Sequence, residues 1–526
     1  MGTCTYTLAR NCGNKTGPWF SVEGKNEERG GAGLTYLKKL YVTVEGVTVT
    51  LMKARRTLVN GLRVALPSSP SPMMTLSLAG QYVTVATTFG LRVRWDGNHY
   101  AQITLPSTYS NQTCGLCGDY DGNPGDDFTK PDGRPAANAN DFANSWQTPD
   151  DEDDVCKPGT KPDPVCEPIL EAEVMKPEKC GKMKDPLGPF RECIPKVSPE
   201  PFFLSCVYDM CQFSGQQSVL CDQLQAYTDA CQSAGAIVHP WRTASFCPAP
   251  VCPPNSSYTL CGSGCPETCV GAAGPPGCGD VCVEGCQCDP GFILSDAQCV
   301  SLKDCGCTDP HGSYHPAGDH WVEEGCAERC ECLGGGQIRC HAASCRPVSE
   351  SCQLQGGEYG CHPVETGICS VSGDPHYVTF DRRTHHYQGS CSYTLTEPCG
   401  PTATNSSLPA FSVVTQNEHR DSQRRFSYVR AVVVSVHGTD YVLGKGRVVQ
   451  VNGTKRTPPL TLTNGVEIYL SGKFVVLETA FGLRVRFDGN HHADVTLPKS
   501  YSGLLCGLCG KERSVSLAYC RWLAGR

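Results

Sequence analysis

The chain has 526 residues, a formal net charge of −8 and 37 cysteines. The negative charge disfavours nucleic acid as a partner, and no run of about 18 apolar residues is present to cross a membrane. Reducing cytosol does not sustain such a density of cysteine, so the composition predicts an extracellular chain whose thiols are oxidised to disulfides.

The cysteines fall into blocks that divide the chain into modules. Five lie between Cys4 and Cys156, eight between Cys166 and Cys247, ten between Cys252 and Cys305, eight between Cys307 and Cys361, and six between Cys369 and Cys520. Because only 39% of the residues are hydrophobic, these modules are expected to have thin cores. Each native disulfide adds about 2 to 4 kcal/mol of stability, which compensates for a thin core.

The first 156 residues predict an antiparallel, β-rich domain. Apolar residues alternate with arginines over 91–95, and residues 41–44 and 47–49 are alternating runs on either side of a Glu-Gly turn. The segment Phe89-Gly-Leu-Arg-Val-Arg-Trp-Asp-Gly-Asn-His99 recurs 392 residues later with Phe487 in place of Trp95, and Cys114-Gly-Leu-Cys117-Gly recurs at the same offset. One domain type therefore occurs twice.

An acidic segment follows the first Cys-Gly-Leu-Cys motif. Asp119, Asp121, Asn123, Asp126 and Asp127 lie within nine residues, and two glycines between them permit tight curvature. Carboxylate and carboxamide oxygens directed at one point are typical of a calcium loop. The alternative interpretation is a polar turn in which an aspartate caps a helix.

The middle of the chain changes character twice. The acidic run at 150–154 is interpreted as a solvated linker. Over 202–231 few helix breakers occur, and residues such as Cys206, Met210, Leu220 and Leu224 have helical spacing, which predicts short helices tied by disulfides. From Cys252 to Cys361, Gly, Pro and Cys dominate, so turns held by bridges are expected to replace a core.

These motifs, the stretch from Gly373 to Asp381 and the order of the cysteine blocks resemble the von Willebrand factor D assembly. The resemblance implies a multidomain, mainly β fold in which antiparallel D-type domains flank a small helical eight-cysteine domain and disulfide-rich small modules. The implied modules are an N-terminally truncated D-type domain (1–156), the eight-cysteine domain (160–248), a trypsin-inhibitor-like domain (250–306), a von Willebrand C-like or E module (307–368) and a second, truncated or divergent D-type domain (369–526). Within this family, the repeats most resemble the IgG Fc-binding branch of mucus, and zonadhesins and tectorins are its near neighbours.

The resemblance also bears on the calcium loop. Family members bind calcium there with a further aspartate from an opening strand, which the first domain lacks. The second domain has that aspartate, Asp381, but departs from the family pattern after Gly510. We therefore expect weakened calcium binding at the 119–127 loop, and none in the second domain, where Asp381 is an orphan half-site.

Disulfide pairs are implied by the resemblance in the same way. They are Cys12 with Cys114, Cys4 with Cys156, Cys399 with Cys506, and Cys369 with Cys509. Cys117 then has no partner and is expected to be free or bridged between chains, whereas a pairing of Cys391 with Cys520 is left open. A redox-active Cys-x-x-Cys or a zinc site is the alternative, and the surrounding disulfide network disfavours both.

The segment Gly373-Asp374-Pro375-His376 is the one place where the residues suit cleavage of a peptide bond. The Asp374 carboxyl can attack its own carbonyl carbon, the nitrogen of Pro375 leaves well once protonated, and His376 can manage the proton. The resemblance implies slow self-cleavage of the Asp374 to Pro375 bond. The alternative interpretation is the start of a strand, and the two are compatible. No other catalytic motif is present, so we expect no enzyme beyond this single event.

The predicted function is that of a secreted glycoprotein that scaffolds or crosslinks mucus or extracellular matrix. Five glycosylation sequons begin at Asn14, Asn111, Asn255, Asn405 and Asn452. Mucins or other matrix glycoproteins, and disulfide-linked copies of the chain, are the expected partners; IgG Fc is a family association that no motif locates. The absence of a signal peptide suggests a fragment. The alternatives are zonadhesin-like cell adhesion and protease inhibition through the 278–282 loop, which offers no Arg, Lys or large apolar residue to a protease.

Overall fold

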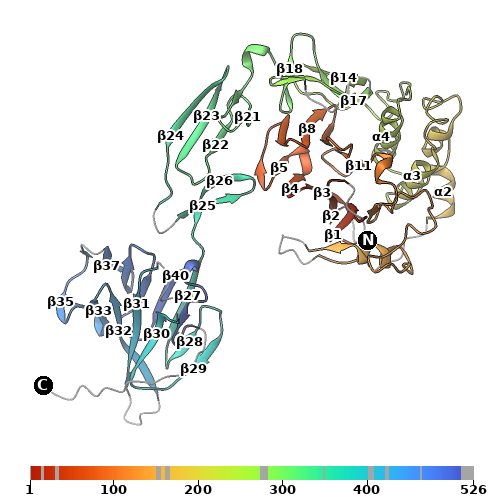
Figure 1. The fold of residues 1–526 in the computed structure, drawn as a ribbon. Helices are drawn as coiled ribbons and strands as arrows, with labels where there is room; N and C mark the ends of the chain where they lie inside the picture. The colour runs from red at the N-terminus through yellow and green to blue at the C-terminus, as the bar shows by residue number, and fades with distance from the viewer. Residues whose placement is uncertain are drawn as a thin grey trace. The chain divides into compact units, whose positions relative to one another are not determined.

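The computed structural model describes residues 2–13, 17–29, 35–149, 156–159, 166–272, 282–346, 350–400, 408–420, 426–462 and 465–510. The chain forms two compact units, which are described separately (Figure 1). The first consists of Met1–Glu323, Ala327–Ala342 and Leu354–Tyr359, and the second of Glu324–Cys326, Ala343–Gln353 and Gly360–Arg526.

Two antiparallel sheets form the first D-type domain. One has the order β12-β1-β2-β3-β4-β5-β6, with β13 also paired to β1, and the other has the order β11-β10-β9-β8-β7. Their bounds are β1 Thr5–Asn11, β2 Phe20–Glu28, β3 Thr35–Val44, β4 Val47–Leu51, β5 Thr57–Val59, β6 Leu62–Arg63, β7 Ser68–Ser71, β8 Met74–Ala79, β9 Tyr82–Thr87, β10 Arg92–Trp95, β11 Ala101–Thr104, β12 Thr113–Cys114 and β13 Gln147–Thr148. One hydrophobic cluster, which includes Phe20, Val42, Val85 and Trp95, fills the space between the sheets.

The alternating runs of the sequence form the strands predicted for them. β3 and β4 are a hairpin whose turn residues, Glu45 and Gly46, have φ angles of 45° and 87°. Such left-handed pairs match the twist of two antiparallel strands. In β10 the apolar residues Val93 and Trp95 face the core, as the alternation predicts, and the Trp95 indole N–H donates to the carbonyl oxygen of Met52 at 2.8 Å.

The eight-cysteine module is helical, as its periodicity predicted. The α-helices in the described part of the first unit are α1 Ala139–Ser145, which lies in the D-type domain, and α2 Pro168–Val174, α3 Glu200–Gln212 and α4 Gln217–Ser233, which lie in the eight-cysteine module. Four disulfides, each with one cysteine on α3 or α4, tie these two helices to their surroundings: Cys166 with Cys211, Cys180 with Cys206, Cys193 with Cys231, and Cys221 with Cys247.

Helix α4 is shared by three modules of the first unit. Leu224 and Tyr227 pack in the core of the helical module. Asp229 accepts a hydrogen bond from the Tyr82 hydroxyl of the D-type domain. Gln232 donates to the carbonyl oxygen of Leu260 at 2.6 Å and accepts the backbone N–H of Glu284 at 3.1 Å, both in the next module. The C-terminal half of α4 is therefore buried on several sides.

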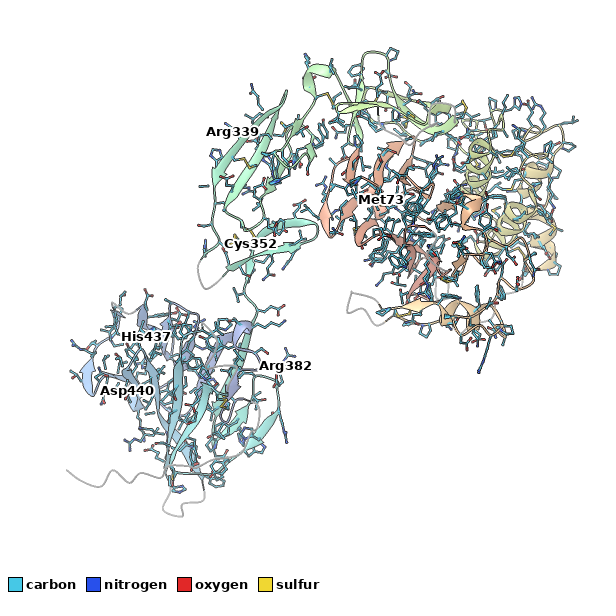
Figure 2. The ribbon with its side chains drawn as sticks, viewed as in Figure 1. Met73, Arg339, Cys352, Arg382, His437 and Asp440 are labelled. Atoms are coloured by element: carbon cyan, nitrogen blue, oxygen red, sulfur yellow. A yellow bond between two sulfur atoms is a disulfide. The ribbon has the colours of Figure 1, made fainter. Side chains whose placement is uncertain are left out.

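The small modules consist of short strands and disulfides. Their bounds are β14 Ser256–Ser263, β15 Glu267–Thr268, β16 Gly271–Ala272, β17 Cys282–Cys288, β18 Ile293–Ser295, β19 Gln298–Val300, β20 Cys307–Thr308, β21 Tyr314–His315, β22 His320–Val322, β23 Glu328–Gly334, β24 Gln337–Ala342, β25 Glu350–Gln355 and β26 Glu358–Pro363. They pair as β14-β17, β16-β15-β18-β19, β20-β21, β22-β23-β24 and β25-β26. Few of their side chains are buried, and bridges such as that of Cys352, labelled in Figure 2, with Cys326 replace a core.

The second D-type domain repeats the sandwich of two antiparallel sheets. Their orders are β29-β28-β27-β40-β39-β38-β37-β36 and β35-β34-β33-β32-β31-β30-β41. The bounds are β27 Thr366–Ser372, β28 His376–Val378, β29 Thr384–His386, β30 Ser392–Pro398, β31 Phe411–His419, β32 Ser427–Val436, β33 Thr439–Gly444, β34 Val448–Val451, β35 Thr454–Arg456, β36 Leu460–Thr461, β37 Val466–Ser471, β38 Phe474–Thr479, β39 Arg484–Phe487, β40 Ala493–Pro498 and β41 Leu505–Cys506. Val429, Val434, Val485 and Val495 belong to the single core between them. No helix within the described ranges is long and apolar enough to cross a membrane.

Candidate functional site

The acidic loop of the first D-type domain gathers three carboxylates. Oxygen atoms of Asp119, Asp121 and Asp126 lie within 4.8 Å of one another. The loop folds through successive i to i+2 hydrogen bonds: Asp119 accepts the N–H of Asp121 at 3.2 Å, Asp121 that of Asn123 at 2.6 Å, and Asn123 that of Gly125 at 3.1 Å. Three negative charges this close repel one another, so a cation between them would stabilise the loop.

Two of the predicted ligands are placed differently. The carboxylate of Asp127 approaches Gly118 and Cys117 and is not part of the three-carboxylate group. The side-chain oxygen of Asn123 accepts the N–H of Gly125. Calcium takes six to eight oxygen ligands, so the three carboxylates fit the ion but leave part of its coordination to water or other donors.

In the second D-type domain, Asp381 lies at the turn between β28 and β29, next to Arg382, which is labelled in Figure 2. Its side chain is exposed. The preceding backbone N–H, of Phe380, donates to the carbonyl oxygen of Cys509 at 3.3 Å. This contact places Asp381 near the second cysteine of the Cys-Gly-Leu-Cys motif. The tail after Gly510, where the family's acidic loop would stand, lies outside the described residues.

The structure joins the cysteine pairs that the resemblance implies. Its bridges include Cys12 with Cys114, Cys4 with Cys156, Cys399 with Cys506, and Cys369 with Cys509. Cys391 is also disulfide-bonded, and its suggested partner Cys520 lies outside the described residues. The two motifs are therefore built into bridges between distant strands.

Cys117 is the one free cysteine in the described part of the chain, and its side chain is exposed. Desolvation by neighbouring atoms and the nearby Asp127 carboxylate both raise the pKa of its thiol. A raised pKa leaves less thiolate at neutral pH, whereas redox-active Cys-x-x-Cys motifs lower it. The chemistry of this thiol thus disfavours the redox alternative.

The self-cleavage segment is surrounded by polar groups. His376 Nε2 lies 2.9 Å from an Asp374 carboxylate oxygen, and His376 Nδ1 lies 2.6 Å from Nδ1 of His386. In this contact one of the two imidazole nitrogens donates its N–H and the other accepts it. The backbone N–H of Gly373 donates to Nδ1 of His491 at 3.3 Å.

Gln388 is the residue here that sequence reasoning missed. Its side-chain N–H donates to the carbonyl oxygen of Asp374 at 2.8 Å. Its side-chain oxygen accepts the backbone N–H of Ser427 at 2.9 Å, which fixes the orientation of the amide. A donor on this carbonyl stabilises negative charge on the oxygen when the carbonyl carbon is attacked. No motif marks Gln388, because it lies 14 residues from Asp374 and meets it only in the fold.

The glycosylation sequons differ in accessibility. Asn111 and Asn452 are exposed, and the Asn452 side chain uses its oxygen to accept the N–H of Asp440. The side-chain nitrogen of Asn255, to which a sugar would be attached, donates to the carbonyl oxygen of Cys299 at 3.1 Å. Asn14 and Asn405 lie outside the described residues, as do the acidic linker and most of the 278–282 loop.

This architecture defines a disulfide-tied extracellular-type assembly in which two β-sandwich domains flank a helical module and small cysteine-rich modules. Family models agree segment by segment. The von Willebrand factor type D domain matches residues 1–134 and 369–512, the C8 domain 179–248, the trypsin inhibitor like cysteine rich domain 252–305, and the TILa domain 306–362. The chain belongs to the von Willebrand factor type D domain family. TILa is the family that matches the segment interpreted as a von Willebrand C-like or E module.

Several known proteins are similar over almost the whole chain. Zonadhesin of Sus scrofa is 47% identical over 98% of the chain, IgGFc-binding protein of Homo sapiens 39% over 97%, and alpha-tectorin of Homo sapiens 34% over 97%. The match spans 21%, 10% and 24% of these proteins, respectively. The identity to the zonadhesin exceeds that to the Fc-binding relative, although the repeats in the sequence favoured the Fc-binding branch of the family.

Proposed function

We propose that the chain is part of a secreted, disulfide-rich glycoprotein that scaffolds or crosslinks mucus or extracellular matrix. The observation that carries this proposal is the disulfide network: every cysteine in the described ranges except Cys117 is bonded. Such a network is stable only in an oxidising compartment. The family membership and the relatives support a structural or adhesive role over turnover of a substrate.

The bridges suit a structural role because they close long loops. The first D-type domain is closed between Cys4 and Cys156, over 152 residues, and the second between Cys369 and Cys509, over 140. Restriction of long loops in the unfolded chain favours the native state most in the chain-entropy model. Calcium held by Asp119, Asp121 and Asp126 would add rigidity at the acidic loop by neutralising their mutual repulsion.

Thiol titration of the secreted chain in denaturant without reductant tests the proposal. We expect few reactive thiols, with Cys117 among the labelled sites when alkylated peptides are mapped. Recovery of a chain in which most sulfhydryls react, or which carries zinc on them, would contradict a disulfide scaffold.

Self-cleavage at Asp374 is proposed as a maturation step. A carboxyl oxygen of Asp374 attacks its own carbonyl carbon, Gln388 stabilises the developing oxyanion, and the bond to Pro375 breaks as the proline nitrogen takes up a proton. Water then hydrolyses the cyclic anhydride to two carboxyl groups. The Asp374 and His376 side chains are 33% and 49% exposed, so water and protons reach them. The contact of His376 with His386 supports a relay that delivers the proton.

The cut would leave the two pieces joined. Cys369 precedes the scissile bond and Cys509 follows it, and the two are bridged. Electrophoresis after mild acid incubation would then show two pieces only in the presence of reductant. A single chain under reducing conditions would contradict self-cleavage.

Mucins, other matrix glycoproteins and further copies of the chain are the partners we propose. One relative is named IgGFc-binding protein, and this name assigns IgG Fc binding to that relative only. Capture of the chain on immobilised Fc fragments, compared with immobilised mucin, tests both classes of partner.

A further inference from the structure

We propose that His376 and His386 bind a divalent transition-metal ion of the zinc type, and that the bound ion slows cleavage between Asp374 and Pro375. The effect on cleavage rests on the self-cleavage proposed above, whereas the metal site rests on the geometry of the two histidines alone. Both lie on the hairpin of β28 and β29, whose turn carries Arg382 (Figure 2).

The strand register brings the two imidazoles together. His376 and His386 lie directly opposite each other in the antiparallel pair of β28 and β29, so their side chains share one face of the hairpin. Their ring centroids are 4.6 Å apart, the ring planes are almost perpendicular, and the two Nδ1 atoms are 2.6 Å apart. Two imidazole nitrogens that converge from two hydrogen-bonded strands form a ready pair of ligands for a metal ion.

The third histidine of the hairpin is used differently. His385 lies opposite Tyr377 in the register and therefore belongs to the other face. Its ring stacks on that of Tyr377 with centroids 5.0 Å apart, and its Nε2 lies 2.9 Å from the carbonyl oxygen of Leu508. His385 thus belongs to the packing of the sheet, which leaves His376 and His386 as the pair directed at one point.

The Asp374 carboxylate completes the arrangement behind His376. Its oxygen lies 2.9 Å from Nε2 of His376. An ionised carboxylate only accepts hydrogen bonds, so Nε2 carries the proton and Nδ1 of the same ring keeps its lone pair. A carboxylate behind a histidine fixes the ring and makes the other nitrogen a better metal ligand. The Nδ1 proton of His386 moves to its own Nε2 by exchange with water, after which two lone pairs face the ion.

The pair can open to the size of a zinc ion. Zinc bonds to imidazole nitrogen at about 2.0 to 2.1 Å, so a tetrahedral ion holds two such nitrogens about 3.3 Å apart. The His376 side chain is 49% exposed and His386 is exposed, so the rings can separate by the small distance required and water can supply the remaining ligands. Imidazole suits zinc and copper, whereas calcium takes oxygen ligands such as those of the acidic loop.

A bound ion interferes with the proposed proton relay. Cleavage requires a proton at the nitrogen of Pro375, and the contact between the two histidines supplies a route for it through His376. An ion on Nδ1 of His376 blocks the return of a proton from His386 and keeps the Nε2 proton on Asp374. Because a positioned proton donor contributes about a hundredfold or more to a rate, loss of the relay should slow cleavage measurably.

Titration of the freshly purified, intact chain with zinc, in competition with a coloured zinc indicator, measures the affinity of the site. Cys117 is first alkylated without reductant, so that its free thiol takes no zinc. His386→Asn removes one ligand at an exposed position and should weaken zinc binding about tenfold or more, since loss of even an outer partner of a ligand has that effect. The matched control His437→Asn, at an exposed turn with a φ angle of 51° that asparagine tolerates, should bind like the parent. Equal affinities of the two variants would overturn the metal site.

Acylation of histidines by diethyl pyrocarbonate, mapped on peptides, locates the ion. Zinc should protect His376 and His386 and leave His437 reactive, and calcium should protect none of the three. His376 and His386 that stay reactive at saturating zinc would contradict the site.

Reducing gels measure the effect on cleavage during incubation at neutral pH. Saturating zinc should slow cleavage of the parent about tenfold or more, a chelator should restore the rate, and His386→Asn should cleave at one rate with and without zinc. A parent that binds zinc at the pair and cleaves at an unchanged rate would overturn the effect on cleavage. If the parent cleaves in neither state, the proposed maturation step fails, while affinity and acylation still decide the metal site.

Discussion

The Asp229→Asn substitution should stabilise the first unit relative to the parent chain, by an amount that grows as the pH rises. Asp229 lies on α4, is fully buried, and accepts hydrogen bonds from the Tyr82 hydroxyl and, at 3.2 Å, from the side chain of Gln225. Its other carboxylate oxygen has no partner among the described residues. Burial raises the pKa of this carboxyl to about 7, although the charge of Arg94 and the hydrogen bonds of Tyr82 and Gln225 act to lower it.

The sign and size of the effect follow from linkage. A carboxyl whose pKa is raised by folding holds its proton more tightly in the native state, so stability is greatest below the unfolded pKa of about 4. Stability falls as the pH rises towards about 7, where the native carboxyl must ionise in its buried site. A difference of about three pKa units corresponds to about 4 kcal/mol between pH 4 and pH 8. Asparagine preserves the shape but does not ionise, so it removes this loss.

Urea unfolding followed by tryptophan fluorescence measures the effect. Five of the six tryptophans, at 19, 95, 146, 241 and 321, precede residue 324, and none lies between 369 and 510, so the signal reports mainly on the first unit. The free energy of the variant relative to the parent should rise by several kcal/mol from pH 4 to pH 8, while the exposed control Asp132→Asn stays level. A variant less stable than the parent at pH 8, or a difference independent of pH, would refute the reasoning.

Three further predictions concern the candidate sites. Asp126→Ala should weaken calcium binding about tenfold or more in calorimetric titration, because it removes one of three gathered carboxylates, whereas Asp132→Asn should not; equal affinities would exclude the loop. Gln388→Leu should slow self-cleavage about a hundredfold on reducing gels, because the oxyanion loses a donor. His437→Ala, at the turn before β33 and labelled in Figure 2, serves as its control, and cleavage at the parent rate in Gln388→Leu would count against the role of the amide. The intact chain should not inhibit trypsin or chymotrypsin in a panel assay, because its 278–282 loop offers no suitable side chain, and tight inhibition would revive the protease-inhibitor alternative.

Elements whose signal is local were predictable from the sequence. Alternation of apolar residues was sufficient for β10, and the Glu-Gly pair was sufficient for the β3-β4 turn, because side-chain period and turn chemistry act over a few residues. The gathered carboxylates of the acidic loop could be predicted for the same reason. The different position of Asp127 could not, because it depends on how the loop packs beside Gly118 and Cys117.

Contacts between modules left no local signal. Asp229 and Gln232 are polar residues near the end of an amphipathic helix, where a single-helix pattern would place them in water. They are buried because two further modules pack against α4, and only the tertiary structure shows it. Gln388 is similar, because its role at Asp374 requires β32 to hold its amide through Ser427.

The sharing of α4 has a consequence for how this kind of chain evolves. The helix of this module is packed and hydrogen-bonded by both neighbouring modules, so a module that is copied or exchanged alone loses those partners. Polar groups such as Gln232 would then have no hydrogen-bond partner in the protein. Gene duplication should therefore preserve the entire set from one β-sandwich to the next. The 392-residue interval between the two copies of the Phe-Gly-Leu-Arg-Val segment spans one such set.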